Sequence, residues 1–192
     1  MSISVIQWGT GNVGQAALRS VLEHVNYELV GCYVSSPSKV GVDAADFVGL
    51  PACGVKATSD INEILKLKAD VVLHMPLSGA QVNEDPTKDT KDICALLRSG
   101  KNVITTVGYV YPKAYGADVL RELEEACAVG GVSLHGTGVN PGFMAELVPL
   151  IFTSHSQSIK SILVREHSDF SFYASPQIIF DVMGFSLAPE AY

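Results

Sequence analysis

The stretch Val5-Ile6-Gln7-Trp8-Gly9-Thr10-Gly11-Asn12-Val13-Gly14 joins an apolar run to three glycines in the spacing G-x-G-x-x-G. The apolar run predicts a buried strand, and the residues that follow recur at helical spacing. In such a unit the first glycine permits a tight turn, the second lets a pyrophosphate approach, and the third lets the helix pack on the strand. Free N–H groups at the helix start bind a diphosphate without a basic residue. The alternative is a tight turn without a ligand. The predicted dinucleotide-binding residues of this turn are Gly9, Thr10, Gly11, Asn12, Val13 and Gly14.

The rest of the chain alternates short apolar runs with longer amphipathic ones. This order predicts an α/β fold, a Rossmann-type doubly wound parallel sheet with helices on both faces. Helices are predicted from about Asp89 to Ser99 and from Gly116 to Val129, each ended by glycine. The charge run Glu84–Asp92 is interpreted as a solvated helix start without a binding role. The predicted strands are Ile3–Trp8, Glu28–Val34, Asp70–Met75, Asn102–Val107 and Val132–His135.

The pattern changes near residue 156. Ile159–Glu166 alternates partly, which predicts a longer strand, and Pro176–Met183 predicts a helix. We therefore expect a nucleotide-binding domain over 1–156. We expect residues 157–192 to be the truncated beginning of a mixed α/β domain for substrate binding or dimerisation, because a separate domain usually needs at least about 50 residues.

Composition narrows the classes of ligand. The 192 residues are 47% hydrophobic with a formal net charge of −7. A core is therefore expected, and the negative charge argues against nucleic acid or an anionic membrane as partner. No signal peptide or membrane-spanning run is recognised. Neither the four cysteines nor the five histidines show metal-ligand spacing, so we expect no metal, reduced thiols and a cytoplasmic location.

The end of the second predicted strand bears on the choice of cofactor. NAD-selective Rossmann domains carry a carboxylate there, whereas Ser35, Ser36 and Lys39 offer hydroxyls and a cation before Asp43. These groups suit a 2′-phosphate, so NADP is favoured over NAD, which stays possible. The alternative is that Ser36-Pro37-Ser38 is only a turn and Lys39 a solvated side chain.

Other candidates follow from position, because ligands bind outside the carboxyl ends of parallel strands. His74 and Met75 could equally be packing residues at a strand end. Asn140 could cap the following helix or bond the carboxamide of a nicotinamide. The further predicted cofactor-binding residues are His74, Met75, Pro76, Thr105, Thr106, Asn140, Pro141 and Gly142.

Three side chains are candidates for proton transfer, namely Tyr109, His167 and Tyr173. Each has a structural alternative. The tyrosines could pack as amphipathic aromatics, and His167 could face solvent from a strand.

Three motifs together resemble a known family: the Val5–Gly14 stretch, Thr105–Pro112 and Gly136–Phe143. They are similar to the dihydrodipicolinate-reductase-like group that includes 2,4-diaminopentanoate dehydrogenase and native amine dehydrogenases, over roughly residues 3–185. The resemblance implies NAD(P)-dependent reduction of a C=N or C=O bond, or the reverse oxidation, between the Rossmann domain and a following α/β domain.

Two departures narrow this expectation. The paired histidines and catalytic lysine of dihydrodipicolinate reductase have no counterpart in Arg165–Asp169, which disfavours lysine biosynthesis. The amine-oxidising branch places an acidic residue after the fifth strand, where this chain has Gly108-Tyr109, which argues against an amine substrate.

The leading hypothesis is an oxidoreductase that transfers hydride between NADP and a small carbonyl, imine or amine, as a homodimer or higher homo-oligomer. The alternatives are a non-catalytic dinucleotide-binding module, a truncated fragment of such an enzyme, and a structural or partner-binding α/β domain. We expect the 192-residue chain to bind cofactor with little turnover.

Overall fold

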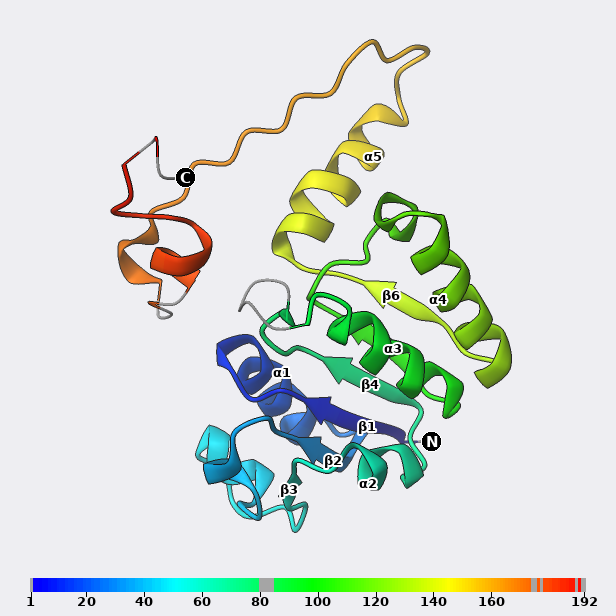
Figure 1. Cartoon of the computed structure of the whole chain (residues 1–192), viewed down its shortest axis with the longest axis vertical. Helices are drawn as coiled ribbons and strands as arrows, with labels where there is room; N and C mark the ends of the chain where they lie inside the picture. Colours follow the sequence, from blue (N-terminus) through cyan, green and yellow to red (C-terminus); the bar gives the residue numbers. More distant parts are fainter. Residues whose placement is uncertain (1, 80–84, 174–175, 177, 189, 191–192) are drawn as a thin grey trace.

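The computed structural model describes residues 2–79, 85–173, 176, 178–188 and 190 (Figure 1). At its centre is a parallel six-stranded sheet in the order β3-β2-β1-β4-β5-β6. The order reverses between β1 and β4, as in a doubly wound Rossmann fold, which confirms the predicted fold class. The strands are β1 (Ile3–Trp8), β2 (Tyr27–Tyr33), β3 (Ala57–Thr58), β4 (Val71–His74), β5 (Asn102–Thr105) and β6 (Leu134–Gly136).

Helices connect the strands. The α-helices are α1 (Asn12–Glu23), α2 (Ile61–Lys66), α3 (Lys88–Arg98), α4 (Ala117–Gly130) and α5 (Val148–Thr153). The shorter or irregular helical segments are η1 (Pro37–Lys39), η2 (Ala44–Val48), η4 (Pro112–Tyr115), η5 (Val139–Leu147), η6 (Phe170–Phe172) and η7 (Ile178–Val182).

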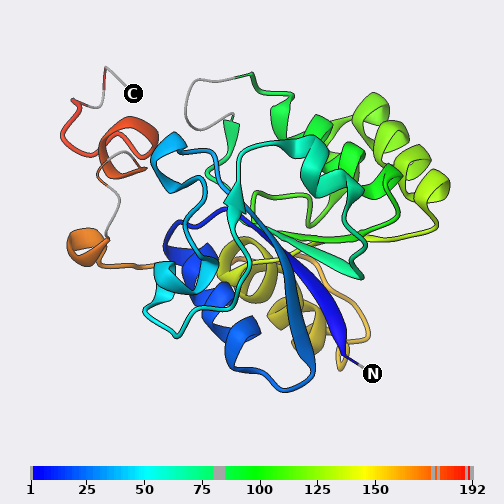
Figure 2. The same cartoon turned by 90° about the horizontal axis from the view of Figure 1, so that it is seen from below.

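The sheet has a core on each face because successive strand residues point to opposite sides. Val5 joins the core under α1 and η2, whereas the next residue, Ile6, joins the core under α2, α3 and α4. Figure 2 shows α1 (blue) on one side of the sheet and α3 and α4 (green) on the other. Leu18 on α1 and Ile93 on α3 are fully buried, so helices cover both faces of the sheet.

The five strands predicted between residues 3 and 135 are confirmed, as are the helices predicted over Asp89–Ser99 and Gly116–Val129, with ends that agree to within two residues. The short elements β3 and α2 are not predicted, because two strand residues and six helix residues carry too little periodicity. None of the helices in the described residues is long and apolar enough to cross a membrane.

The predicted strand Ile159–Glu166 is wrong. These residues are extended, exposed and outside the sheet. Figure 1 shows the segment (orange) leaving α5 without running beside a strand. An extended segment becomes a strand only where a neighbour satisfies its backbone N–H and C=O groups. The predicted helix Pro176–Met183 includes residue 177, outside the described residues, and its described part contains the single turn η7.

Candidate functional site

A cleft of about 480 Å³ opens at the carboxyl ends of β1, β2 and β4. This is the edge where the strand order reverses, the position at which open α/β sheets bind ligands. The volume lies in the range of small-molecule sites. The lining residues are Trp8, Gly9, Thr10, Gly11, Tyr33, Ser35, Ser36, Lys39, Met75, Pro76, Leu77, Lys88, Asp89 and Asp92.

The structure requires glycine at two of the three glycine positions of the turn. Gly9 has φ +91°, and a Cβ there would lie 2.6 Å from the Met75 carbonyl oxygen. A Cβ on Gly14 would lie 2.1 Å from the Gly9 oxygen, so close packing of α1 requires glycine. A Cβ on Gly11 would meet nothing within 4 Å. Packing therefore explains Gly9 and Gly14, and leaves Gly11 beside open space in the cleft.

The start of α1 faces this space. Gly11 is its N-cap residue and provides no side-chain cap, and the first turn contains no acidic residue. The first N–H groups of an α-helix have no partner within the helix, and the helix dipole makes this end positive. Backbone N–H groups next to the space at Gly11 are suited to an anion such as a diphosphate.

The end of β2 forms a second wall, with Ser35, Ser36 and Lys39. The Lys39 ammonium donates to the carbonyl oxygen and the Oγ1 of Thr10, both at 3.0 Å. It also lies 5.5 Å from the ring centre of Phe47. Lys39 is therefore held against the glycine turn, and the alternative of a freely solvated side chain does not hold.

The third wall combines the end of β4 with the first turn of α3. Met75 and Pro76 were predicted, whereas Lys88, Asp89 and Asp92 belong to the charge run interpreted as a solvated helix start. Solvation was wrongly predicted for Asp89 and Asp92, whose side chains are largely buried, whereas Lys88 is 44% exposed. Asp89 accepts hydrogen bonds from Ser78 Oγ at 2.7 Å and the Gly79 N–H at 3.1 Å. In the sequence, the spacing of four residues between Lys88 and Asp92 was the one indication that these two side chains pair on the same face of a helix.

Two aromatic side chains, Trp8 and Tyr33, form part of the cleft lining. Tyr33 stacks on Trp8 with ring centres 3.8 Å apart and an angle of 22° between the rings. Burial raises the pKa of Tyr33, and the nearby Lys88 ammonium partly opposes this shift. Sequence reasoning missed both aromatic residues because a strand pattern does not show which side chains reach the strand ends.

His74 and Thr105 meet at the ends of β4 and β5 but do not line the cleft. His74 Nδ1 and Thr105 Oγ1 share a hydrogen bond of 2.9 Å, and both side chains are fully buried. Burial, assisted by the Lys88 charge, lowers the pKa of His74 to about 3, so the ring is neutral. Within the described residues its Nε2 has no hydrogen-bond partner. The neighbouring Thr106 is half-buried outside the cleft lining.

The three proton-transfer candidates are not brought together at the cleft. Tyr109 is buried, its hydroxyl shares a 2.7 Å hydrogen bond with Thr90 Oγ1, and burial raises its pKa. His167 is exposed in the extended segment, and Tyr173 is exposed after η6. None of the three lines the cleft, and their roles stay predictions.

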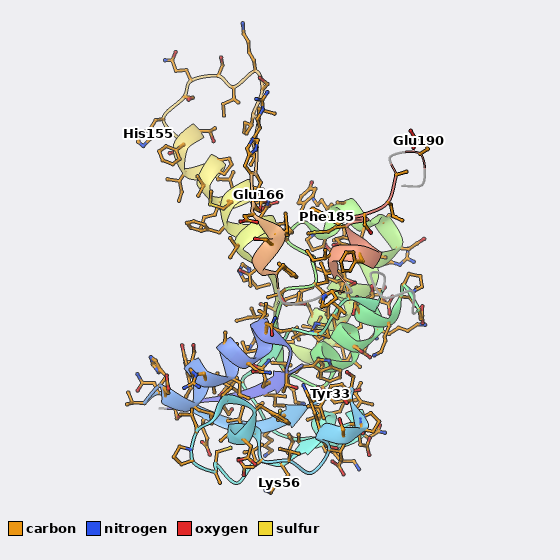
Figure 3. All side chains as sticks on the ribbon, turned by 90° about the vertical axis from the view of Figure 1, so that its left-hand side faces the viewer. Tyr33, Lys56, His155, Glu166, Phe185 and Glu190 are labelled. Carbon is orange, nitrogen blue, oxygen red and sulfur yellow. The ribbon has the colours of Figure 1, made fainter. Side chains whose placement is uncertain are left out.

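The Asn140 side chain caps neither η5 nor α5, and its contact with a nicotinamide stays a prediction. Its amide donates to the Glu166 carboxylate, which also accepts from Ser168 Oγ at 2.8 Å. These hydrogen bonds lower the pKa of Glu166, and the one from Asn140 has the largest effect. Figure 3 shows Glu166 beside the yellow helical segment and Tyr33 at the opposite part of the fold. Pro141 is exposed and Gly142 half-buried, and neither lines the cleft.

The described residues contain no group of three or more His, Cys, Asp or Glu side chains able to hold a metal ion. The four cysteines are free thiols, and burial raises the pKa of Cys32 to about 12.

The comparisons with known proteins agree with this geometry. A family model described as dihydrodipicolinate reductase, N-terminus, matches residues 3–109. An amine dehydrogenase of Streptomyces virginiae is 32% identical over 95% of this chain and 50% of its own length. A 2,4-diaminopentanoate dehydrogenase of Acetoanaerobium sticklandii is 27% identical over 88% of this chain and 47% of its own length. The chain thus spans about half the length of these curated relatives.

Among solved structures, a biliverdin reductase of Synechocystis sp. PCC 6803, in complex with biliverdin and NADP+, has a TM-score of 0.51 at 18% identity. The match covers 70% of this chain and 37% of that one, and it supports the fold.

Proposed function

The chain belongs to the family described as dihydrodipicolinate reductase, N-terminus, and we propose that it binds a nicotinamide dinucleotide in the cleft beside Gly11. The observation that carries the proposal is the open space around Gly11, because the fold itself does not require glycine there. A diphosphate against that backbone supplies the missing reason. The NADP+ in the biliverdin reductase complex supports the same class of cofactor.

We propose that each part of the cofactor binds a different wall of the cleft. The diphosphate contacts the backbone of Gly9 to Gly11 and the start of α1. The adenosine ribose lies at the end of β2, where Ser35, Ser36 and Lys39 replace the carboxylate typical of NAD-selective domains. Lys39 is already fixed by Thr10, so its charge is placed beside the ribose without further ordering. We therefore favour NADP over NAD.

The proposed activity of the whole protein is hydride transfer between NADP(H) and a small substrate at a C=N or C=O bond. The cofactor supplies the hydride, and the protein binds and orients it. The names of both curated relatives favour an amine or imine over a carbonyl. This weighs against the sequence argument from Gly108-Tyr109, and we propose the amine–imine class.

A non-catalytic dinucleotide-binding module is the second candidate. It is favoured by the cleft lining, which comes from β1, β2, β4 and α3 with their adjoining loops and includes no residue from the ends of β5 or β6. The described cleft therefore matches the adenosine-diphosphate half of the cofactor. The two candidates differ in turnover: a polypeptide of these 192 residues that oxidises amines at a substantial steady-state rate excludes the second.

Thermal-shift titration tests the proposal directly. A ligand bound only by the folded state raises the melting temperature with concentration. NADP and NADPH should raise the Tm in a saturable manner, and NAD and NADH should do so at higher concentrations. No saturable shift with any of the four would reject the proposed function.

The assembly and the location of the protein stay predictions. We propose a homodimer or higher homo-oligomer of a cytoplasmic protein that acts on a small molecule. Leu150, Ile151 and Phe152 on α5 are mostly exposed, which supports self-association. Light scattering after size-exclusion chromatography measures the mass, and a monomer at all concentrations would contradict this proposal.

A further inference from the structure

The proposed placement of the diphosphate and the ribose leaves one wall of the cleft without a role. It consists of the β4 end, Met75 to Leu77, the ring of Tyr33, and Lys88 and Asp92 on α3. A dinucleotide whose diphosphate lies at Gly11 and whose ribose lies at Ser35 and Ser36 has one adenosine component left, the base. The inference below rests on the proposed function, and it concerns how that base is recognised.

Lys88 and Asp92 stand four residues apart on one face of α3. The Lys88 ammonium lies 2.5 Å from Oδ2 of Asp92, so a donor and an acceptor are held side by side at the cleft. The Asp92 side chain is only 16% exposed, and that of Lys88 is 44% exposed. A carboxylate can accept about four hydrogen bonds and an ammonium can donate three, so the ion pair leaves capacity on both groups for a ligand.

The surroundings suit a flat ring. Tyr33 is backed by Trp8, which fixes its ring plane, and Pro76 and Leu77 add apolar surface. Asp89 ties Ser78 and Gly79 to the same helical turn, so the loop after β4 keeps its place relative to Lys88 and Asp92. Apolar faces with polar groups at one edge are the usual composition of a site for an aromatic heterocycle.

Adenine presents a complementary edge. Its exocyclic N6 amino group is a donor, and ring nitrogens beside it, including N7, are acceptors. We propose that Asp92 and Lys88 recognise the adenine base, with Asp92 accepting from the N6 amino group and Lys88 donating to the ring nitrogen N7. The pair is then a specificity-determining element that distinguishes adenine from other purines.

Hypoxanthine tests this assignment because it differs from adenine at the recognised edge. It carries an acceptor oxygen in place of the amino group, so Asp92 would face an acceptor and lose its hydrogen bond. A site that hydrogen-bonds a polar group of its ligand binds an analogue more weakly when that analogue leaves a polar group of the site without a hydrogen-bond partner. We expect the wild-type chain to bind NADP at least about tenfold more tightly than nicotinamide hypoxanthine dinucleotide phosphate, as for loss of a hydrogen bond to a charged group.

The experiment measures both dissociation constants by calorimetry for the wild-type chain and for Asp92→Asn. An amide can present its oxygen to N6 or its NH₂ to O6, so the variant should bind both dinucleotides with affinities within about threefold. Asp118→Asn is the matched control, since it makes the same charge change in an exposed α4 ion pair, with Arg121, outside the cleft. It should keep the wild-type ratio.

The ratio separates recognition from a structural role, because a displaced helix would weaken both ligands equally. Equal affinities in the wild-type chain would overturn the proposal, as would a wild-type ratio in a folded Asp92→Asn variant. The wild-type ratio remains decisive if that variant does not fold. Failure of both dinucleotides to bind the wild-type chain would instead reject the proposed function, and this inference with it.

Discussion

Gly11 and Gly14 stand three positions apart in one turn, yet the structure requires glycine at only one of them. Gly14 is enclosed by the backbone of Gly9, whereas Gly11 borders open space. The sequence motif treats the two alike, because spacing alone does not show which glycine faces the protein and which faces a ligand.

Substitution by alanine should separate the two roles. Gly14→Ala forces a Cβ to 2.1 Å from the Gly9 oxygen, so the backbone must shift. We expect the free energy of unfolding to fall by about 1–3 kcal/mol, as for overpacking in a core. Gly11→Ala should change it by less than about 1 kcal/mol, the cost of alanine at an N-cap. Urea unfolding measures both, and equal losses would contradict the assigned roles.

His74 should make stability depend on pH. The unfolded chain takes up a proton near pH 6.5, but in the native state the pKa is lowered to about 3. Acid therefore favours the unfolded state, and stability is lost as pH falls below 6.5. From about pH 7.5 to about pH 5.5 the contribution from His74 should fall by roughly 1.4 kcal/mol.

His74→Asn removes the titrating ring and should abolish this part of the pH dependence, measured by urea unfolding at the two pH values. His155 is exposed, so His155→Asn is the control and should leave the dependence in place. The same pH dependence in the His74→Asn protein would show that another group is responsible.

The residues at the β2 end should set the choice between NADP and NAD. Ser35 is exposed at the cleft, so Ser35→Asp introduces a carboxylate without disturbing the core. It accepts hydrogen bonds from ribose hydroxyls and repels a 2′-phosphate, so the ratio of the NADP and NAD dissociation constants should shift toward NAD by about tenfold or more. Calorimetry measures the ratio. An unchanged ratio would show that the 2′-group of the adenosine ribose does not bind near Ser35.

At the scale of elements, long periodic segments were predictable and short ones were not. β1 and α3 follow from apolar spacing, whereas β3 has two residues and depends on distant groups. The buried Asp43 carboxylate accepts N–H bonds from Ala45, Cys53 and Gly54. These bonds hold its pKa well below the usual range and close the loop that brings β3 to β2.

Asp43→Ala should therefore destabilise this part of the fold. It leaves three backbone N–H groups without their acceptor, and we expect the free energy of unfolding to fall by about 3 kcal/mol or more. Asp46→Ala on the neighbouring η2 segment is the control, because that side chain is exposed. Denaturant unfolding compares the variants, and similar small losses in both would contradict the role of Asp43.

The same limit applies to the candidate site. The glycine turn, Ser35, Ser36, Lys39, Met75 and Pro76 could be predicted, since they follow strand ends in the sequence. Tyr33 and Asp92 could not, because their place at the cleft depends on the direction of a strand side chain and on how α3 is packed. The sequence shows which residues follow the strand ends and so lie at the binding edge of the sheet. Which of their neighbours also reach the cleft depends on how the side chains pack.

At the scale of the whole molecule, the structure joins a two-faced Rossmann fold to an extended segment. The strand predicted over Ile159–Glu166 failed because alternation describes a side-chain pattern and does not supply a neighbouring edge. The cleft has the volume of a small-molecule site, and we propose that it binds the adenosine-diphosphate half of a dinucleotide. Cofactor binding at the glycine turn can therefore be tested without knowledge of the substrate.

Calorimetric titration of NADP into the wild-type chain and Gly11→Val is the most direct test. The valine side chain fits the space where the diphosphate is proposed to lie, so the variant should remain folded, with near-native thermal unfolding. We predict saturable binding to the wild-type chain and a loss of affinity of at least about a hundredfold in the variant. Equal NADP affinity in a folded Gly11→Val protein would contradict the assignment of this cleft as the cofactor site.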